Sequence, residues 1–379
     1  MTSITLALLS IQTVALAVLV VRLWPGRRRL PPVEPSDREI LDTSVSVIVT
    51  TLNEASRIGP CLAGLRAQRR PVLEILVVDS RSTDGTRELV SAAAALDARV
   101  QLLTDDPLPD GWVGKVWALE HGLRAARGEW VLGIDADTEP APGMVAAAVA
   151  ACRAARYSIV SFSPKFSDQS AAEQFIQPAL LLTLVYRGGA VGAEADPERV
   201  LANGQCFLAQ RDVLIRHGGF YPARGSFADD VTLARHLARR GERVGFLDGS
   251  RLYSVRSYES ASEMWREWGR SLDLKNATSA ARQWLDIVYL TAVQGLPLPV
   301  LIGLAFAART SPLATPALLL ALVNGGLLMV HLLLLRPLSH SYKRAGVTFW
   351  FSWLADPLAV ARIVMSTVQR RRTWRGRSY

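Results

Sequence analysis

The sequence predicts an α/β domain with a mainly parallel sheet, flanked by transmembrane helices at both ends. Between residues 44 and 250, apolar strand-like runs alternate with helix-like segments, a pattern typical of a parallel sheet covered on both faces. Uncharged stretches long enough to cross a bilayer lie near both ends of the chain. Several strand-like runs end in acidic or amide residues, and ligands of such sheets bind beyond the carboxyl ends of the strands.

The elements of the α/β domain follow one another in a regular order. Strands are expected at 44–52, 73–80, 98–104 and 129–137, and helices at 56–68, 83–98 and 117–128, the last of them closed by Gly128.

Two common nucleotide-binding motifs are missing from the sequence. No Walker motif is present, and no G-x-G-x-x-G motif opens a helix after the first strand, which argues against a P-loop ATPase and a dinucleotide-dependent oxidoreductase.

The first apolar stretch, Ile4 to Val21, is expected to be an uncleaved membrane anchor. A signal peptide would carry positive charge before the apolar run and a small-residue cleavage site after it, whereas here arginines follow at 27–29. The positive-inside rule places these arginines, and the domain after them, in the cytoplasm. The protein is therefore expected in the cell membrane as a multi-pass protein with a cytoplasmic catalytic domain.

Further apolar stretches lie toward the other end of the sequence. Residues 287–308 and 313–335 are of spanning length, whereas 346–368 is interrupted by Asp356-Pro357 and Arg362. A full last span would export the arginine-rich residues 370–379 against the charge rule, so a re-entrant or interfacial hairpin is favoured, with a true span as the alternative. The expected parts are an anchor (1–24), a linker (25–43), the catalytic domain (44–260), an amphipathic interfacial segment (261–283), two transmembrane helices (284–336), the last apolar segment (345–369) and a basic tail (370–379).

The charge distribution and the cysteine spacing argue against a nucleic-acid partner, a disulfide and a zinc site. The formal net charge is +9, but many basic residues flank the membrane segments, where they meet anionic headgroups, so no nucleic acid is expected. The three cysteines are isolated, which predicts neither a disulfide nor a zinc site. Protein partners are not indicated.

Acidic and polar residues follow three of the predicted strands. They are Thr51 with Asn53 and Glu54, then Asp79, then Asp135 with Asp137. Each group could be a helix cap or a solvated turn, but their convergence on one sheet edge favours a site. If the fourth strand runs through residue 137, both of its carboxylates face one side, where a divalent cation would offset their repulsion. Mg²⁺ or Mn²⁺ suits such oxygen ligands and bridges them to phosphates.

These segments resemble a known family. TTLNEASRIGPCL, VVDSRSTDGT and GIDAD resemble the nucleotide-sugar-binding half of the family 2 glycosyltransferases. LPDGWVGKVWAL and the tail WRGRSY resemble its membrane-bound branch, which includes carotenoid glycosyltransferases and hopanoid-associated glycosyltransferases. The resemblance implies a Rossmann-like fold of the GT-A type and a divalent cation, Mg²⁺ or Mn²⁺.

The same resemblance assigns roles on the donor side. Asp79 would accept a hydrogen bond from the uracil imide, Lys115 would neutralise the diphosphate, and Asp137 would be the principal metal ligand. Asp135 would contact the ribose or the metal shell. The nucleotide pocket would be lined by Thr51, Asn53 and Glu54.

On the acceptor side the resemblance points to Asp230 as the catalytic base. Asp229 would raise the pKa of this carboxyl by repulsion, although two acids at a helix start are also common as plain N-terminal residues. Farther on, YESASEMWREWGRSLDLK departs from the family's Arg/Trp spacing but supplies the same residue types. Trp268, Arg270 and Arg266 are the expected contacts to acceptor or diphosphate, and an interfacial amphipathic helix is the alternative.

The expected activity is inverting transfer of a hexose, glucose first, from a UDP-sugar to the hydroxyl of a membrane lipid, with a carotenoid as the first acceptor. A hopanoid, polyprenyl phosphate or sphingolipid-like acceptor is the alternative. A further alternative is a non-catalytic membrane partner that binds nucleotide-sugar.

Overall fold

The structure is a computed structural model that describes residues 2–105, 107–167, 170–256, 258, 260–271, 274–369, 373–374 and 377–378. The chain divides into two compact units. We call them the sheet unit (Leu30–Ser167, Glu194–Arg256, Arg371–Tyr379) and the helical unit (Met1–Arg29, Asp168–Ala193, Ser257–Arg370).

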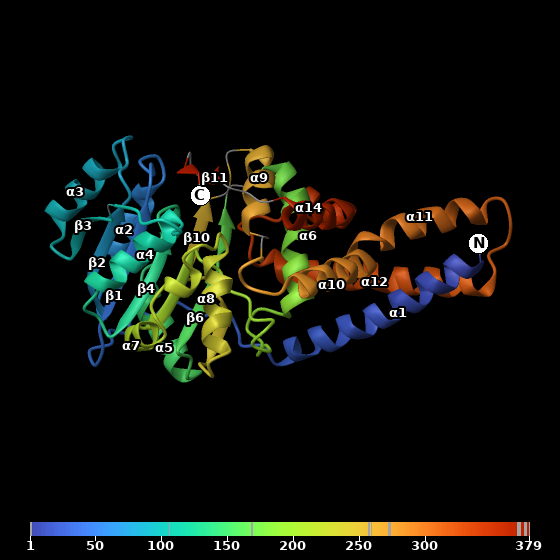
Figure 1. Ribbon diagram of the computed structural model, residues 1–379, viewed down its shortest axis with the longest axis horizontal. Coiled ribbons are helices and arrows are strands. Elements are labelled where there is room, and N and C mark those ends of the chain that lie inside the picture. The colour runs from blue at the N-terminus through green and yellow to red at the C-terminus, as the bar shows by residue number, and fades with distance from the viewer. Residues whose placement is uncertain are drawn as a thin grey trace. The chain divides into compact units, whose positions relative to one another are not determined.

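The sheet unit is built on a seven-stranded sheet in the order β3-β2-β1-β4-β8-β6-β9 (Figure 1). β8 runs antiparallel to both of its neighbours, and the other neighbouring strands are parallel, so the expected mainly parallel sheet is confirmed. The strands are β1 (Val45–Thr51), β2 (Val72–Asp79), β3 (Val100–Thr104), β4 (Trp130–Asp135), β6 (Ile159–Ser163), β8 (Cys206–Gln210) and β9 (Val244–Asp248).

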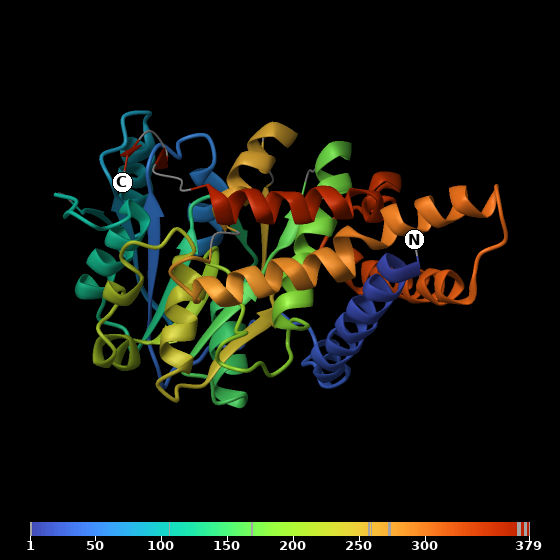
Figure 2. The same cartoon turned by 45° about the vertical axis from the view of Figure 1, so that its right-hand side comes forward.

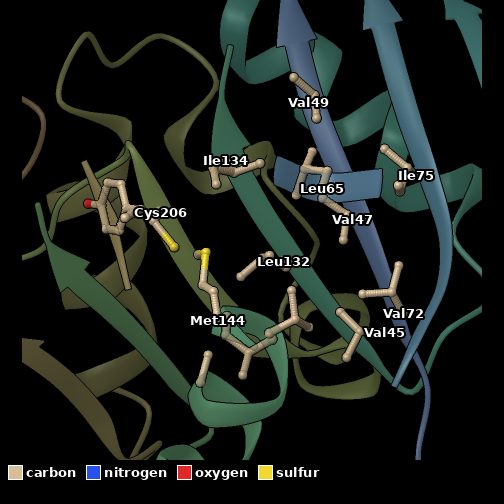
Figure 3. Packing of buried hydrophobic residues seen from close by; sticks show 14 of the residues in the cluster. Val45, Val47, Val49, Leu65, Val72, Ile75, Leu132, Ile134, Met144 and Cys206 are labelled. Atoms are coloured by element: carbon tan, nitrogen blue, oxygen red, sulfur yellow. The ribbon is translucent and has the colours of Figure 1, made fainter. Parts of the chain in front are cut away.

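Helices cover both faces of this sheet. Val45, Val47 and Val49 of β1 point to one face (Figure 3). Ile48 is buried on the other face. The first face packs on α2 (Ile58–Arg66), α3 (Thr86–Leu96) and α5 (Met144–Ala154), and the second on α4 (Gly114–Ala125), α7 (Arg211–Arg216) and α8 (Asp229–Ala238). Smaller elements are β5 (Thr138–Pro140), β7 (Lys165–Ser167), β10 (Tyr253–Arg256), β11 (Thr373–Trp374), β12 (Arg377–Ser378) and the 3-10 turn η2 (Tyr221–Ala223).

One predicted helix boundary was wrong. The helix expected to close at Gly128 is α4, which begins at Gly114 and ends at Ala125. Gly128 instead lies against β1, where its N–H donates to Ser46 Oγ at 2.8 Å. A Cβ atom at this position would lie 2.5 Å from the main-chain nitrogen of Ser46, so the glycine serves a close approach rather than a helix end.

The helical unit contains two segments that are long and apolar enough to cross a membrane, 3–28 and 315–339. A bent pair, 280–295 and 297–308, could form a third, with a bend of 46° between its halves. Figures 1 and 2 show α1 beside α12. The helices are α1 (Thr2–Leu23), α6 (Ala171–Gly188), α9 (Ala261–Ser271), α10 (Ala280–Leu290), α11 (Pro297–Ala308), α12 (Thr315–Ser339), α13 (Val347–Trp350) and α14 (Asp356–Val368), with the 3-10 turns η1 (Trp24–Arg28) and η4 (Ser352–Ala355) and the π-helical turn η3 (Thr291–Gly295).

The last apolar segment is broken in the structure. Its helical pieces α13, η4 and α14 meet near Phe351 and Asp356, and α14 begins at the Asp356-Pro357 step that the sequence marked as an interruption. Whether this segment spans or re-enters a membrane stays a prediction. The structure also groups 168–193, expected within the catalytic domain, with the helical unit, where Gln177 of α6 accepts a hydrogen bond from the Tyr342 hydroxyl at 3.0 Å.

Polar side chains join the helices of this unit. Gln12 of α1 and Asn324 of α12 exchange two amide hydrogen bonds, at 2.8 and 2.7 Å. Two helical turns farther along α12, His331 Nδ1 lies 2.8 Å from Asp356 Oδ2. The other Asp356 oxygen accepts a hydrogen bond from Gln294 of η3 at 2.6 Å. These four elements are thus held together by buried polar contacts.

Candidate active site

Three neighbouring strands end at one edge of the sheet, as the sequence predicted. Thr51 of β1 pairs in register with Asp79 of β2, and Thr50 pairs with Asp135 of β4. The topology therefore brings these strand ends together, although they lie far apart in the sequence. This edge is the candidate active site.

Asp79 is fully buried and organises the loop after β2. Its carboxylate accepts hydrogen bonds from Thr51 Oγ1, the Ser82 N–H and Arg87 Nη1, each at 3.0 Å. The Asp79 side chain exposes no surface, whereas that of Arg87 is 39% exposed. A nucleobase would therefore reach Asp79 only after local rearrangement, and direct recognition of uracil by this residue stays a prediction.

The loops after β1 and β2 are hydrogen-bonded to each other. Asn53 has a left-handed backbone (φ 56°), and its Oδ1 accepts the Thr83 N–H at 2.9 Å. The N–H of Glu54, a buried residue, donates to Thr86 Oγ1 at 2.9 Å. Asp84 accepts the Ala55 N–H at 2.9 Å, so it joins the two loops as well as the start of α3. These contacts fix the walls of the predicted nucleotide pocket.

Lys115 lies in the first turn of α4 and reaches into the site. Its Nζ is 2.6 Å from Asp135 Oδ1 and donates to the Gly204 carbonyl at 3.2 Å. Burial favours the neutral amine, but the carboxylates of Asp135 and Asp229 outweigh it and raise the pKa of Lys115 above its ordinary value. A permanent cation is thus held beside Asp135, and contact with a diphosphate stays a prediction.

Asp230 lies in the first turn of α8. Its Oδ2 accepts the Gly204 N–H at 2.7 Å and its Oδ1 accepts the Val231 N–H at 2.8 Å. Burial raises the pKa of Asp230 to about 7, and repulsion from Asp229 acts in the same direction. A cavity of about 20 Å³, room for a single water molecule, lies between these two carboxylates and apolar side chains that include Phe207 and Phe220.

Gly204 connects the two halves of the site, and the sequence did not single it out. Its N–H binds Asp230 and its carbonyl binds Lys115. A Cβ atom here would lie 3.3 Å from Lys115 Nζ and 3.4 Å from the Asp230 Cβ, so the backbone fits closely between the two side chains. The dipeptide Asn203-Gly204 is typical of a turn, but the neighbouring sequence does not indicate which side chains the turn contacts.

The strand predicted over 129–137 is shorter in the structure, because β4 ends at Asp135 and Asp137 lies in the following turn, so strand alternation does not align the two carboxylates. Within the described part of the chain, no three or more His, Cys, Asp or Glu residues gather as a metal site. A divalent cation would therefore have these two carboxylates and substrate oxygens as ligands, a donor set that suits Mg²⁺ or Mn²⁺. Since Lys115 already holds Asp135, Asp137 is the better candidate for principal ligand.

The predicted acceptor residues lie on α9 in the helical unit. Trp268 is buried, and its indole N–H has no hydrogen-bond partner among the described residues. The Arg266 side chain is exposed, 3.8 Å from Glu267. The Arg270 side chain lies outside the described residues.

Comparison with known proteins supports the fold class. The fold is of the GT-A type: the solved mannosyltransferase PcManGT from Pyrobaculum calidifontis, in complex with GDP-Man and Mn²⁺, matches 96% of this chain and 98% of its own, with a TM-score of 0.52 and 20% identity. Residues 46–215 match the family model described as Glycosyl transferase family 2. This part of the chain is thus similar to the family 2 glycosyltransferases.

Curated relatives match over shorter regions. The putative glycosyltransferase EpsH of Bacillus subtilis (strain 168) is 31% identical over 94 residues, 25% of this chain and 26% of its own. The succinoglycan biosynthesis protein ExoA of Rhizobium meliloti (strain 1021) is 38% identical over 73 residues, 19% of this chain and 22% of its own. The chain spans about a quarter of the length of these relatives.

Proposed function

We propose that the protein transfers a hexose from a UDP-sugar to the hydroxyl of a membrane lipid, with inversion at the anomeric carbon. One observation carries this proposal: Gly204 connects Asp230, whose pKa is about 7, to the ion pair of Lys115 and Asp135. One end of this arrangement can remove a proton, and the other can hold a negatively charged leaving group.

Asp230 is the proposed general base. A base with a pKa near the working pH combines a sizeable ionised fraction with enough basicity to take a hydroxyl proton. The N–H groups of Gly204 and Val231 fix the orientation of its carboxylate. Asp229 keeps the pKa of Asp230 high enough for this task.

Lys115, Asp135 and Asp137 form the proposed donor end. Asp137 and Asp135 would hold Mg²⁺ or Mn²⁺, which supplies Lewis-acid stabilisation of the diphosphate charge when bound. Lys115 stays protonated beside them and adds positive charge. Thr51, Asn53, Glu54 and Asp79 are proposed to shape the nucleotide pocket, Asp79 through the loop contacts it organises.

The candidate membrane segments of the helical unit support a lipid acceptor. We propose a hydroxylated carotenoid as the first acceptor, on the sequence resemblance of residues 108–119 and the tail. Trp268, Arg266 and Arg270 are the proposed acceptor or diphosphate contacts. The chain would lie in the cell membrane with its catalytic domain in the cytoplasm.

The test uses the full chain purified in detergent with Mn²⁺ or Mg²⁺. Donors are a panel of UDP-hexoses, with GDP-mannose as a comparison because the similar mannosyltransferase was solved with GDP-Man. Acceptors are a hydroxylated carotenoid, a hopanoid, a polyprenyl phosphate and a sphingolipid. Release of the nucleoside diphosphate is followed, and the lipid product is identified by mass. Metal-dependent UDP binding without any product would contradict the proposal.

Asp230→Asn is the decisive variant. We expect kcat to fall about 10²- to 10⁴-fold, the usual contribution of a general base, while donor KM changes little. Asp212→Asn is the matched control, because Asp212 is an exposed acid in the first turn of α7. If Asp230→Asn transferred sugar as fast as the control, the base assignment would fail.

A further inference from the structure

Two basic side chains join α9 and α14, each reaching toward the other helix. Arg362 of α14 is 1% exposed, and its Nε donates to the Trp265 carbonyl of α9 at 2.8 Å. In the other direction Lys275, just beyond α9, donates to the carbonyls of Ser366 and Gln369 at 3.1 and 2.8 Å. A cation is favourable at the C-terminal end of a helix, where carbonyls carry partial negative charge.

The contact fixes one register between the two helices. A Cβ atom at Gly269 would lie 1.4 Å from Arg362 Nη2, so the guanidinium fills the space that any other residue at 269 would need. The same guanidinium lies over the Trp265 ring, 5.3 Å from the ring centroid. Sliding α9 along α14 would therefore force the Arg362 side chain into a neighbouring Cβ.

The residue beside this contact carries an unused donor. Trp268 precedes Gly269 and is buried, and its indole N–H makes no hydrogen bond within the described parts of the chain. A buried indole N–H usually has a partner, because leaving it unpaired costs free energy. Because Trp268 is the neighbour of Gly269 on α9, a shift of α9 away from Arg362 would also move the Trp268 indole.

We propose that Arg362 is a positioning residue for sugar transfer: it holds α9 in the register that keeps the Trp268 N–H available to an oxygen of the lipid acceptor. The inference rests on the proposed function, and it gives the last apolar segment a part in acceptor binding. We choose the acceptor over the donor because α9 belongs to the unit that contains the candidate membrane spans.

The test is a double-mutant cycle in the full-length protein with Gly269→Ala, Arg362→Met and the double variant. Each single change is expected to raise the acceptor KM about tenfold, while donor KM and acceptor-independent donor hydrolysis stay unchanged. Because Gly269→Ala acts by displacing the guanidinium, the double variant should be no worse than Arg362→Met alone. The controls are Gly303→Ala, whose added Cβ would meet nothing, and Arg309→Met at an exposed site.

The proposal would be overturned if the acceptor KM of the double variant rose by the product of the two single effects, or if donor KM rose as much as acceptor KM. A second measurement does not depend on activity: hydrogen exchange of residues 261–271 should become about tenfold faster in Arg362→Met, while β1 exchanges as before. Unchanged exchange would also overturn it. If the intact protein transfers no sugar, the proposed function fails by itself, and the exchange measurement still decides whether Arg362 holds α9.

Discussion

At the residue scale, the ionisation of Asp230 decides how activity should depend on pH. Its half-buried carboxyl lies beside the Gly204 backbone and Asp229 and borders a cavity with room for a single water molecule. The charged form therefore loses solvation that two N–H groups and Lys115 replace only in part. The resulting pKa of about 7 is a consequence of packing rather than of residue type.

We expect kcat/KM to rise with pH around this value, because only the deprotonated carboxylate accepts a proton. With a pKa of about 7, activity should increase about tenfold between pH 6 and pH 8. Asp229→Asn removes the repulsion that favours the protonated form, so the midpoint should move to lower pH. Steady-state rates across pH at saturating metal check both statements. An unchanged midpoint in Asp229→Asn would contradict the claim that Asp229 raises the pKa of Asp230.

Many residues of the candidate site could be predicted from the sequence, but the contacts between them could not. Asp135 was expected because acidic residues at strand ends are visible in a linear pattern, whereas the roles of Lys115 and Asp230 were expected from the resemblance to the family 2 glycosyltransferases. The contacts of Gly204 and the Ser80–Asp105 hydrogen bond (2.7 Å) were not expected, because each joins segments whose proximity depends on the fold. A sequence shows which groups can react, whereas the fold decides which groups meet.

At the element scale, β4 shows how one strand is matched to its neighbour. Gly133 lies opposite Phe207 of β8, and a Cβ atom at 133 would lie 2.1 Å from Phe207 Cε1. The strand thus uses a glycine where the sheet needs space for an aromatic ring. The apolar run predicted the strand itself, but it did not predict this pairing, because an antiparallel neighbour inserted from residue 206 onward leaves no local signal.

Gly133→Ala should therefore destabilise the sheet unit by about 1–3 kcal/mol, the usual cost of overpacking a core. The thermal unfolding midpoint of the purified protein measures this change. Phe207→Leu should recover part of the loss in the Gly133→Ala background, since a smaller side chain leaves room for the added methyl group. Equal destabilisation by Phe207→Leu in both backgrounds would show that the two positions do not interact.

At the scale of the whole molecule, the helical unit is assembled from segments taken from three parts of the sequence. The Gln12–Asn324 amide pair joins α1 to α12, and Gln12 also donates to the Ala292 carbonyl of η3 at 3.0 Å. Hydropathy predicted apolar helices near both ends of the sequence, but it could not predict that the first helix and a later one would pack together. The polar residues that specify the pairing count against a membrane span in any hydropathy sum.

We expect Asn324→Leu to lower the stability of the helical unit by about 1–2 kcal/mol, because Gln12 Oε1 loses the hydrogen bond that Asn324 donates to it. The double change Gln12→Leu with Asn324→Leu should be less harmful than Asn324→Leu alone, since neither amide is then left unpaired. Thermal unfolding in detergent compares the three proteins. A double variant that is destabilised by the sum of the single effects would contradict the pairing.

The same amide pair bears on how the chain is made. Gln12 and Asn324 are separated by 312 positions, so the ribosome must synthesise residues 30–167 and 194–256 of the sheet unit between them. At elongation rates of about 5–20 residues per second, the first helix would wait roughly 15–60 seconds for Asn324. Until then the Gln12 amide needs other hydrogen-bond partners, such as water or, once it is made, the Ala292 carbonyl, and α1 reaches its final place only when α12 has been synthesised.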